Sequence, residues 1–203
     1  MSLVTLLCAC LNVMHKFTYL SFNWLITKIN NETLRKNLGE IHGVVYDLGC
    51  GIRPYENDIL KVADRYIGVD WSSTLHEMRA DVVADLNKPL PVDDKVANTV
   101  VSFQVMEHLC EPQIMLNEAH RILKPGGTIF LTVPWQWWIH EKPYDFYRYT
   151  PYGLDYMFNK AGFIDVSIEA QGGFFTMWVL KLNYFTKRFV RGPLPFRWFI
   201  NAV

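Results

Sequence analysis

Residues 44–56 read VVYDLGCGIRPYE, a run of β-branched and aromatic residues that breaks at two glycines spaced two apart. Such a run is typical of a buried strand. Gly49 and Gly51 then allow the backbone to approach a ligand without a Cβ in the way. In an open α/β sheet, ligands bind beyond the carboxyl ends of the strands. The stretch therefore predicts a strand followed by a ligand-binding loop, although a tight turn without a ligand also has this pattern.

Strands and helices alternate in the sequence that follows. Strands are predicted at 44–49, 65–72, 80–86, 96–103, 128–134 and 163–170. Helices are predicted over 1–38, 54–64, 111–123 and 151–162, with Lys124–Gly127 ending the third of them. For residues 174–183 a last strand is the favoured interpretation. This alternation predicts a parallel, doubly wound α/β sheet.

The bulk composition limits the class of protein. The chain has 203 residues, half of them hydrophobic, and 20 basic residues balance 20 acidic ones. A single globular domain is expected, and a nucleic-acid partner is not. The four cysteines (8, 10, 50 and 110) form neither a CxxC pair nor a disulfide ladder, so we expect no metal and a reducing, cytoplasmic location. The apolar stretch 3–14 is shorter than the roughly 20 residues of a membrane span.

The glycine loop matches neither of two common nucleotide motifs. It lacks the Gly-Lys-Ser/Thr ending of a phosphate loop, and Pro54 occupies the third glycine position of the dinucleotide fingerprint. Asp70 follows Gly51 by 19 residues, at the tip of the second predicted strand. An acid at that distance accepts hydrogen bonds from ribose hydroxyls. The site therefore suits an adenosine-type nucleoside without a pyrophosphate, and S-adenosylmethionine fits that description.

From residue 44 to about 173 the chain resembles the class I S-adenosylmethionine-dependent methyltransferases, in particular the methyltransferase type 11 group. The matching motifs are DLGCG, YIGVD, DVVADLNKPLPVDD, VVSFQVMEHL, EAHRILKPGGTIFLTVP and HEKPYDFYRYT…GL…AGF. The resemblance implies a Rossmann-like sheet of seven strands, the last one antiparallel, and S-adenosyl-L-methionine as cofactor. We divide the chain into an N-terminal helical segment (1–43), a cofactor-binding domain (44–180) and a basic aromatic C-terminal segment (181–203).

The resemblance also implies roles for individual residues. It places Asp47, Gly49 and Gly51 at the methionine end of the cofactor, Asp70 at the ribose hydroxyls, Asp85 and Leu86 at the adenine, and Gln104 beside the sulfonium. The sequence IRPY departs from the family after the second glycine, where many relatives have a small residue. Arg53 then either reaches the cofactor carboxylate or points into solvent.

Candidate catalytic residues follow the fourth and fifth predicted strands. They are Glu107, His108, His140 and Asp145. A histidine accepts a proton near neutral pH, which a hydroxyl acceptor requires and an amine or thiol needs less. Alternatives stay open: the EHL motif as helix-terminal packing, Asp145 paired with Arg148 in a structural loop, and positioning without any base. The WQWW motif at 135–138 favours a lid or core role over a substrate cage.

The C-terminal stretch 172–203 contains five basic residues and no acid, with two Trp and six Phe. Basic residues interleaved with aromatic ones suit a membrane surface. For 185–203, peripheral membrane attachment, a lipid-linked substrate or self-association competes with simple packing. The predicted function is methyl transfer to a small-molecule or glycan/lipid-type acceptor. The alternatives are a non-catalytic module that acts through this tail, and a nucleotide-dependent oxidoreductase, which the missing third glycine disfavours.

Overall fold

The computed structural model describes residues 24–72 and 78–189 and divides into two compact units. The larger unit is Gly39–Ile168, and the smaller one combines the segments that precede and follow it. Residues 1–23 of the predicted N-terminal helical segment and residues 190–203 of the predicted C-terminal segment lie outside the described residues. The predicted domain boundaries after residues 43 and 180 stay predictions.

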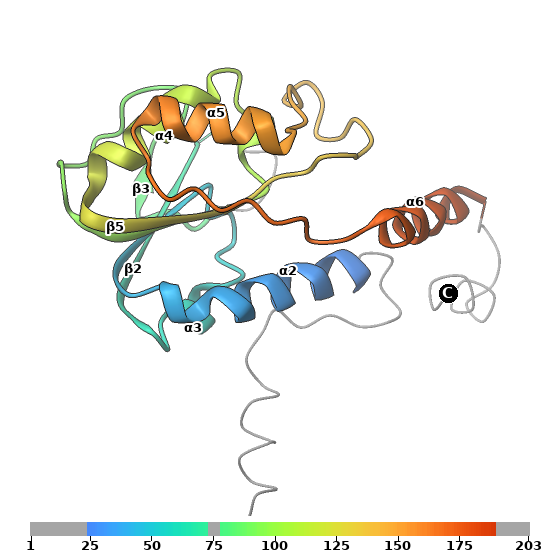
Figure 1. Ribbon diagram of the computed structural model, residues 1–203, viewed down its shortest axis with the longest axis horizontal. Helices are drawn as coiled ribbons and strands as arrows, with labels where there is room; N and C mark the ends of the chain where they lie inside the picture. The colour runs from blue at the N-terminus through green and yellow to red at the C-terminus, as the bar shows by residue number, and fades with distance from the viewer. Residues whose placement is uncertain (1–23, 73–77, 190–203) are drawn as a thin grey trace, which may run out of the picture. The chain divides into compact units, whose positions relative to one another are not determined.

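The larger unit is built on a parallel sheet of five strands in the order β3-β2-β1-β4-β5 (Figure 1). The strands are β1 (Gly43–Leu48), β2 (Ala63–Asp70), β3 (Val82–Val83), β4 (Ala97–Phe103) and β5 (Leu123–Thr132). Consecutive residues such as Val100 and Val101 in β4 are both fully buried, as expected for a parallel strand covered on both faces. The Rossmann-like α/β fold is confirmed. Its strand order reverses between β1 and β4, which is where such sheets bind ligands.

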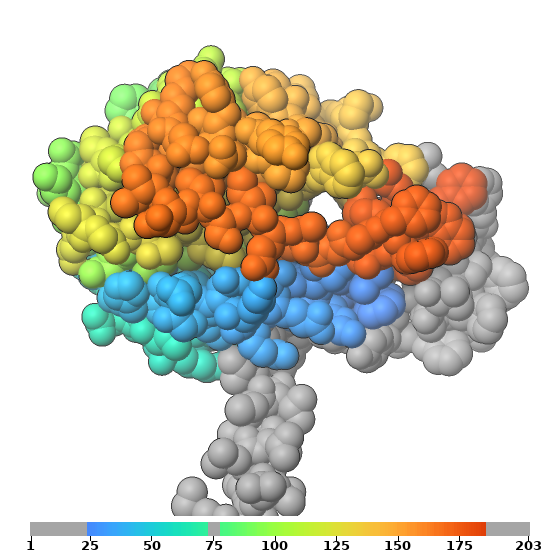
Figure 2. All heavy atoms as spheres, in the orientation of Figure 1, coloured from blue at the N-terminus to red at the C-terminus, as the bar shows by residue number. Residues whose placement is uncertain are grey.

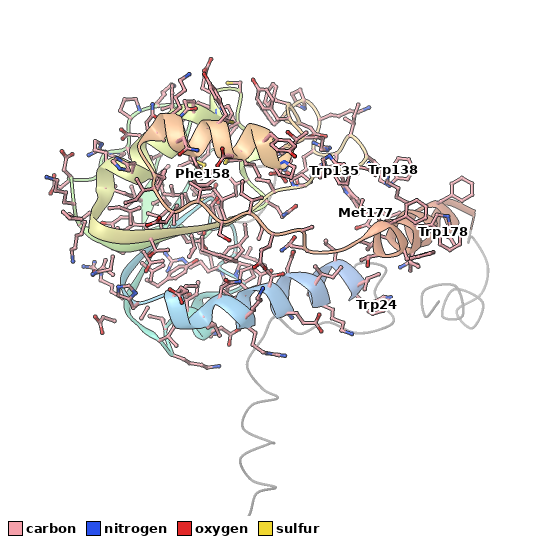
Figure 3. All side chains as sticks on the ribbon, in the orientation of Figure 1. Trp24, Trp135, Trp138, Phe158, Met177 and Trp178 are labelled. Atoms are coloured by element: carbon pink, nitrogen blue, oxygen red, sulfur yellow. The ribbon has the colours of Figure 1, made fainter. Side chains whose placement is uncertain are left out.

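Among the described residues of this unit, the α-helices that connect or follow these strands are α3 (Glu56–Ile59), α4 (Pro112–Ile122) and α5 (Pro151–Ala161). In α4 the buried residues Met115, Leu116, Ala119 and Ile122 recur at helical spacing and form one face of the core. The helices α4 and α5 lie side by side (Figure 1), and buried Phe158 points from α5 toward the sheet (Figure 3).

The ends of α5 confirm the predicted helix signals. Pro151 occupies the first turn, and the Thr150 hydroxyl accepts a hydrogen bond from the Gly153 amide at 3.1 Å. The helix ends at Gly162, whose φ of +96° lies in the left-handed region that glycine tolerates.

Two predicted strands are wrong. Among the described residues, 163–170 form no strand, and the sheet contains five strands. Residues 174–183 belong to a helix, α6 (Phe174–Phe189), which is longer than a typical strand; the apolar run alone fits either structure. The third predicted helix ends as expected just before Lys124–Gly127, since α4 ends at Ile122; residues 124–127 themselves lie within β5, where the register to β4 shifts between Ala97 and Thr99.

The described part of the smaller unit consists of helical segments. The predicted N-terminal helix is confirmed over its described part as α2 (Trp24–Asn37), which the short helix η1 (Leu38–Glu40) follows. The Gln171 amide donates a hydrogen bond to the Thr33 hydroxyl at 3.1 Å, and Lys36 pairs with Glu169. Among the described residues, no helix combines the length and the hydropathy needed to cross a membrane.

Candidate active site

The loop after β1 places its two glycines in the left-handed region, where other residues are strained. Gly49 has a φ of +85°, and a Cβ there would lie 2.4 Å from Cγ2 of Val105. Gly51 has a φ of +49°, but a Cβ there would meet no atom within 4 Å. Gly49 is therefore required for packing, whereas Gly51 borders open space at the switch point of the sheet.

A third glycine, Gly68 in β2, lies against Cys50 of this loop. A Cβ at Gly68 would lie 2.7 Å from Sγ of Cys50, so its absence makes room for the buried Cys50 side chain. Burial raises the pKa of Cys50 to about 12, which keeps the thiol protonated and makes it a packing residue. The sequence analysis did not predict this packing of Cys50 against Gly68, because its only sign in the sequence is the glycine of YIGVD.

Asp70 joins the tip of β2 to the glycine loop. Its Oδ2 accepts a hydrogen bond from the Gly51 amide at 2.6 Å, and its Oδ1 accepts one from the Trp71 amide at 2.6 Å. The structure therefore brings together the acid and the glycine that the sequence paired by spacing. The interaction of Asp70 with ribose hydroxyls stays a prediction.

Asp47, near the carboxyl end of β1, carries a buried carboxylate oxygen without a partner. The Tyr66 hydroxyl donates a hydrogen bond to Oδ2, whereas Oδ1 has no hydrogen-bond partner among the described residues. Burial raises the pKa of Asp47 to about 7. A ligand that brings an ammonium group would satisfy this oxygen and favour the ionised carboxylate.

Arg53 follows neither of the two alternatives considered for it. Its Nη1 lies 3.0 Å from Oε1 of Glu56, its Nη2 pairs with Asp81, and the guanidinium lies over the Tyr66 ring at 5.6 Å from the centroid. These contacts engage the guanidinium with protein acids. Arg53 therefore braces the loop after β1 against the segment that precedes β3.

Three more predicted cofactor residues lie at the carboxyl edge of the sheet. The Asp85 carboxylate accepts hydrogen bonds from the backbone amide and the side chain of Asn87 at 3.0 and 2.9 Å. Leu86 belongs to the buried core. Gln104 has a φ of +56°, and its backbone amide donates a hydrogen bond to the Thr132 carbonyl at 2.9 Å. Their contacts with adenine and sulfonium stay predictions.

Glu107 and His108 lie in a short 3-10 helix, η2 (Met106–His108), after β4. The Glu107 side chain is 0% exposed, and neither of its carboxylate oxygens has a hydrogen-bond partner among the described residues. Burial raises the pKa of Glu107 to about 8. The EHL motif is therefore not the start of α4, and its glutamate is a buried acid that the surrounding protein leaves unsatisfied.

The loop after β5 is organised by an ion pair between Asp145 and Arg148. Two nitrogens of Arg148 donate to the two Asp145 oxygens at 2.6 and 2.9 Å, and the His140 amide donates to Oδ2 at 2.8 Å. Arg148 holds the pKa of Asp145 well below its usual range. The predicted structural pairing of these two residues is confirmed, and a catalytic role of Asp145 stays a prediction.

The loops after β4 and β5 bring the two candidate histidines together. The rings of His108 and His140 meet edge to face with their centroids 4.8 Å apart. Of the neighbouring aromatic residues, Trp135 and Trp138 are exposed (Figure 3), and the loop forms part of the surface next to α5 (Figure 2). The exposure of these two Trp side chains favours a role of the loop as a lid over the site rather than as part of the hydrophobic core.

Comparisons with known proteins agree with this geometry. The family model described as "Methyltransferase domain" matches residues 46–131, which run from the first strand through the glycine loop, Asp70 and Glu107 to β5. Residues 46–131 therefore form a methyltransferase domain of the class I S-adenosylmethionine-dependent type. This match argues against the oxidoreductase alternative, and S-adenosylmethionine is the cofactor of this methyltransferase domain.

Curated relatives match part of the chain. A probable S-adenosylmethionine-dependent methyltransferase of Mycolicibacterium smegmatis is 34% identical over 96 residues, which cover 44% of this chain and 37% of the relative. A ubiquinone biosynthesis O-methyltransferase of Coxiella burnetii is 26% identical over 125 residues, which cover 57% of this chain and 51% of the relative. The chain thus spans about half, or less, of the length of the curated relatives it matches.

A solved structure shows the same fold. Phosphoethanolamine N-methyltransferase 2 of Haemonchus contortus, in complex with phosphomonomethylethanolamine and S-adenosylhomocysteine, superimposes with a TM-score of 0.60 at 16% identity. The match covers 91% of this chain and 51% of that structure. The residues of this methyltransferase domain fit the cofactor, because the open space at Gly51 and the unpartnered Asp47 oxygen suit its amino-acid end.

Proposed function

We propose that the protein transfers a methyl group from S-adenosylmethionine to a small-molecule or glycan/lipid-type acceptor. The observation that carries the proposal is the unpartnered, buried Asp47 oxygen at the same strand end as the Gly51–Asp70 hydrogen bond. Two relatives support a small acceptor by their names alone, a ubiquinone biosynthesis O-methyltransferase and a phosphoethanolamine N-methyltransferase.

On the cofactor side, residues of the chain would bind S-adenosylmethionine and orient it. Asp47 would receive the ammonium group, the backbone at Gly49 and Gly51 would border the methionine end, and Asp70 would hold the ribose hydroxyls while it keeps the Gly51 amide in place. S-adenosylmethionine supplies an activated methyl group when bound. The protein then has mainly to place the attacking atom in line with it.

On the acceptor side, Glu107, His108 and His140 would handle the acceptor and its proton. Of these, His140 and His108 are half-buried, so an entering acceptor can reach their rings, whereas Glu107 lies behind them in the protein. Asp145 would act through His140 as a positioning residue, because its carboxylate accepts the His140 amide hydrogen.

The first experiment is calorimetric titration with S-adenosylhomocysteine. We expect micromolar binding that Asp70→Ala weakens at least tenfold, since hydrogen bonds to a charged group contribute about 1.5–3 kcal/mol. Asp64→Ala is the matched control, because Asp64 is exposed near the opposite end of the same strand. Binding of NAD instead, or equal binding by wild type and Asp70→Ala, would contradict the proposal.

We also propose that the protein attaches peripherally to anionic membranes from a cytoplasmic location. The supporting observation is one exposed face of α6, formed by Phe175, Trp178, Leu182 and Phe185, with Trp178 56% exposed and Phe185 51% exposed (Figure 3). Apolar residues at this spacing share one side of a helix and suit the interface of a bilayer.

Vesicle sedimentation tests this attachment. We expect the protein to pellet with phosphatidylglycerol vesicles more than with phosphatidylcholine vesicles, and Trp178→Ser/Phe185→Ser to abolish the difference. Ile164→Ser is the control, because this exposed residue lies outside α6. Absence of pelleting with either vesicle would refute the attachment, and concentration-dependent self-association in sedimentation velocity would point to the alternative role of this face.

A further inference from the structure

Three potential ligand side chains meet where the loops after β4 and β5 come together. Glu107, His108 and His140 each offer one ligand atom, and these atoms all lie within 4.8 Å of one another. The pairs include Nε2 of His108 and Oε1 of Glu107, which are 3.8 Å apart. Oε2 of Glu141 lies 3.7 Å from the same His108 nitrogen.

The hydrogen bonding of His108 leaves its Nε2 atom unprotonated, with its lone pair available to this cluster. Nδ1 of His108 contacts the Tyr144 carbonyl oxygen, which can only accept a hydrogen bond. In the neutral ring, Nδ1 therefore carries the proton and Nε2 presents a lone pair. Metal-binding histidines almost always have this arrangement, with the other ring nitrogen donating to a carbonyl or carboxylate.

His140 has the corresponding arrangement with different acceptors. Its Nδ1 lies 3.2 Å from the Trp138 carbonyl oxygen and 3.3 Å from Oδ2 of Asp145, whereas the nearest Arg148 nitrogen is 3.4 Å away. Two acceptors, one of them an ionised carboxylate, favour a proton on Nδ1. Nε2 of His140 is then the free ligand atom.

Glu107 supplies the independent observation. It is fully buried, and neither carboxylate oxygen has a hydrogen-bond partner among the described residues. Buried carboxyl groups are nearly always paired, hydrogen-bonded or bound to a metal, because an unsatisfied one costs free energy. A cation between Glu107 and the two histidines would satisfy it.

We propose that Glu107, His108 and His140 bind a divalent first-row transition-metal ion, with Glu141 adjacent as a further oxygen ligand. Two imidazole nitrogens and one carboxylate oxygen form a donor set typical of Zn²⁺ and its neighbours rather than of Mg²⁺. Ligand atoms about 2.0–2.2 Å from such an ion lie roughly 3.5 Å apart, so the side chains need to close by about 1 Å. The proposal departs from the expectation of no metal, which rested on cysteine spacing.

The consequence for the reaction rests on the proposed function. A divalent ion with an open coordination position binds the hydroxyl oxygen of an acceptor and lowers its pKa. With the ion bound, the three side chains hold the metal instead of accepting the proton, which leaves to solvent. The oxygen then attacks the methyl carbon, and the carbon–sulfur bond breaks with its electron pair on sulfur. The site therefore selects an oxygen acceptor over an amine.

The test is metal binding by the full chain without cofactor or acceptor. The metal-free protein is dialysed against Zn²⁺, the bound metal is counted by mass spectrometry, and Co²⁺ is used for visible absorption bands. We expect one Zn²⁺ per chain at micromolar concentration, weak binding of Mg²⁺, and at least about tenfold weaker Zn²⁺ binding in Glu107→Gln and in His140→Gln. His42→Gln is the matched control, because His42 is exposed and lies outside the cluster.

Two further variants keep the result interpretable. If Glu107→Gln does not fold, as judged by circular dichroism, the half-buried His140→Gln and His108→Gln carry the test. Zn²⁺ binding that survives all three cluster substitutions, or that Cys8→Ser/Cys10→Ser removes instead, would overturn the proposal. Titration with S-adenosylhomocysteine is run separately, so a failed metal site is distinguished from a failed cofactor site.

Discussion

The Tyr149 hydroxyl donates a hydrogen bond to the Met106 carbonyl at 2.8 Å, and this contact joins the loop after β5 to η2. The backbone reinforces the junction, because the Phe146 amide donates to the Glu107 carbonyl at 2.8 Å. Glu107 and His108 on one side and His140 on the other are therefore held by two buried or half-buried connections between neighbouring strand ends. The geometry of the acceptor side depends on them.

Tyr149→Phe should destabilise the protein and loosen the acceptor side. Removal of the hydroxyl leaves the Met106 carbonyl with only the Leu109 amide as donor, and loss of one hydrogen bond costs about 0.5–1.5 kcal/mol. We expect a Tm several degrees lower by scanning calorimetry, with binding of S-adenosylhomocysteine nearly unchanged. Tyr152→Phe, at an exposed position of α5, should leave Tm unchanged; an equal loss in both variants would contradict the role assigned to this contact.

Asp145→Asn should disrupt the loop after β5. The substitution leaves the Arg148 guanidinium without its carboxylate partner in a largely buried setting, and removal of one member of such a pair typically costs about 3–5 kcal/mol. We expect faster proteolytic cleavage between residues 135 and 150 and a lower free energy of unfolding in urea. Asp155→Asn, on the exposed side of α5, is the control. A loop that stays as resistant as in wild type would show that the ion pair is dispensable.

The two glycines of the first loop should respond differently to alanine. Gly49→Ala combines a left-handed φ with a Cβ 2.4 Å from Val105, so we expect the variant to lose several kcal/mol of stability or to fail to fold. Gly51→Ala meets no protein atom and should cost only about 1–2 kcal/mol from its φ. Its Cβ enters the open space, so calorimetry should show weaker binding of S-adenosylhomocysteine. Unchanged affinity in a folded Gly51→Ala would place the cofactor elsewhere.

Affinity for S-adenosylhomocysteine should rise with pH through the titration of Asp47. Burial raises the pKa of Asp47 to about 7, so the carboxyl is neutral below that pH in the free protein. An ammonium ligand favours the ionised form, hence binding between pH 5 and 7 releases a proton and strengthens by at most about tenfold per pH unit. Calorimetry in buffers of different ionisation enthalpy measures that proton. Asp47→Asn should bind weakly and without this pH dependence.

The same shift has a defined sign for the stability of the ligand-free protein. Because the folded pKa lies above the unfolded value, the contribution of Asp47 is fully present below about pH 4 and is lost as the pH rises toward 7. Urea unfolding at pH 5 and pH 8 measures this loss. The Asp47→Asn variant should show a smaller difference between the two pH values than wild type.

The sequence alone predicted that the glycine loop and Asp70 belong together, because they lie in consecutive elements. The strand at 44–49, the glycine loop and the acid at the tip of the next strand follow one another along the chain, and a parallel arrangement forces Gly51 and Asp70 to meet. Secondary structure was less predictable after residue 162. There short apolar runs fit a strand and a helix equally well, and residues 174–183 proved to be helical.

Contacts between residues distant in sequence were decided only by the tertiary structure. Spacing does not reveal that Tyr66 satisfies one oxygen of Asp47 and leaves the other unpartnered, nor that Arg53 is engaged by Glu56 and Asp81. Likewise, Glu107 and His108 meet His140 because β4 and β5 are adjacent parallel strands whose carboxyl ends share one edge. Sequence determines which residues end each strand, whereas the order of strands in the sheet determines which of those residues share a site.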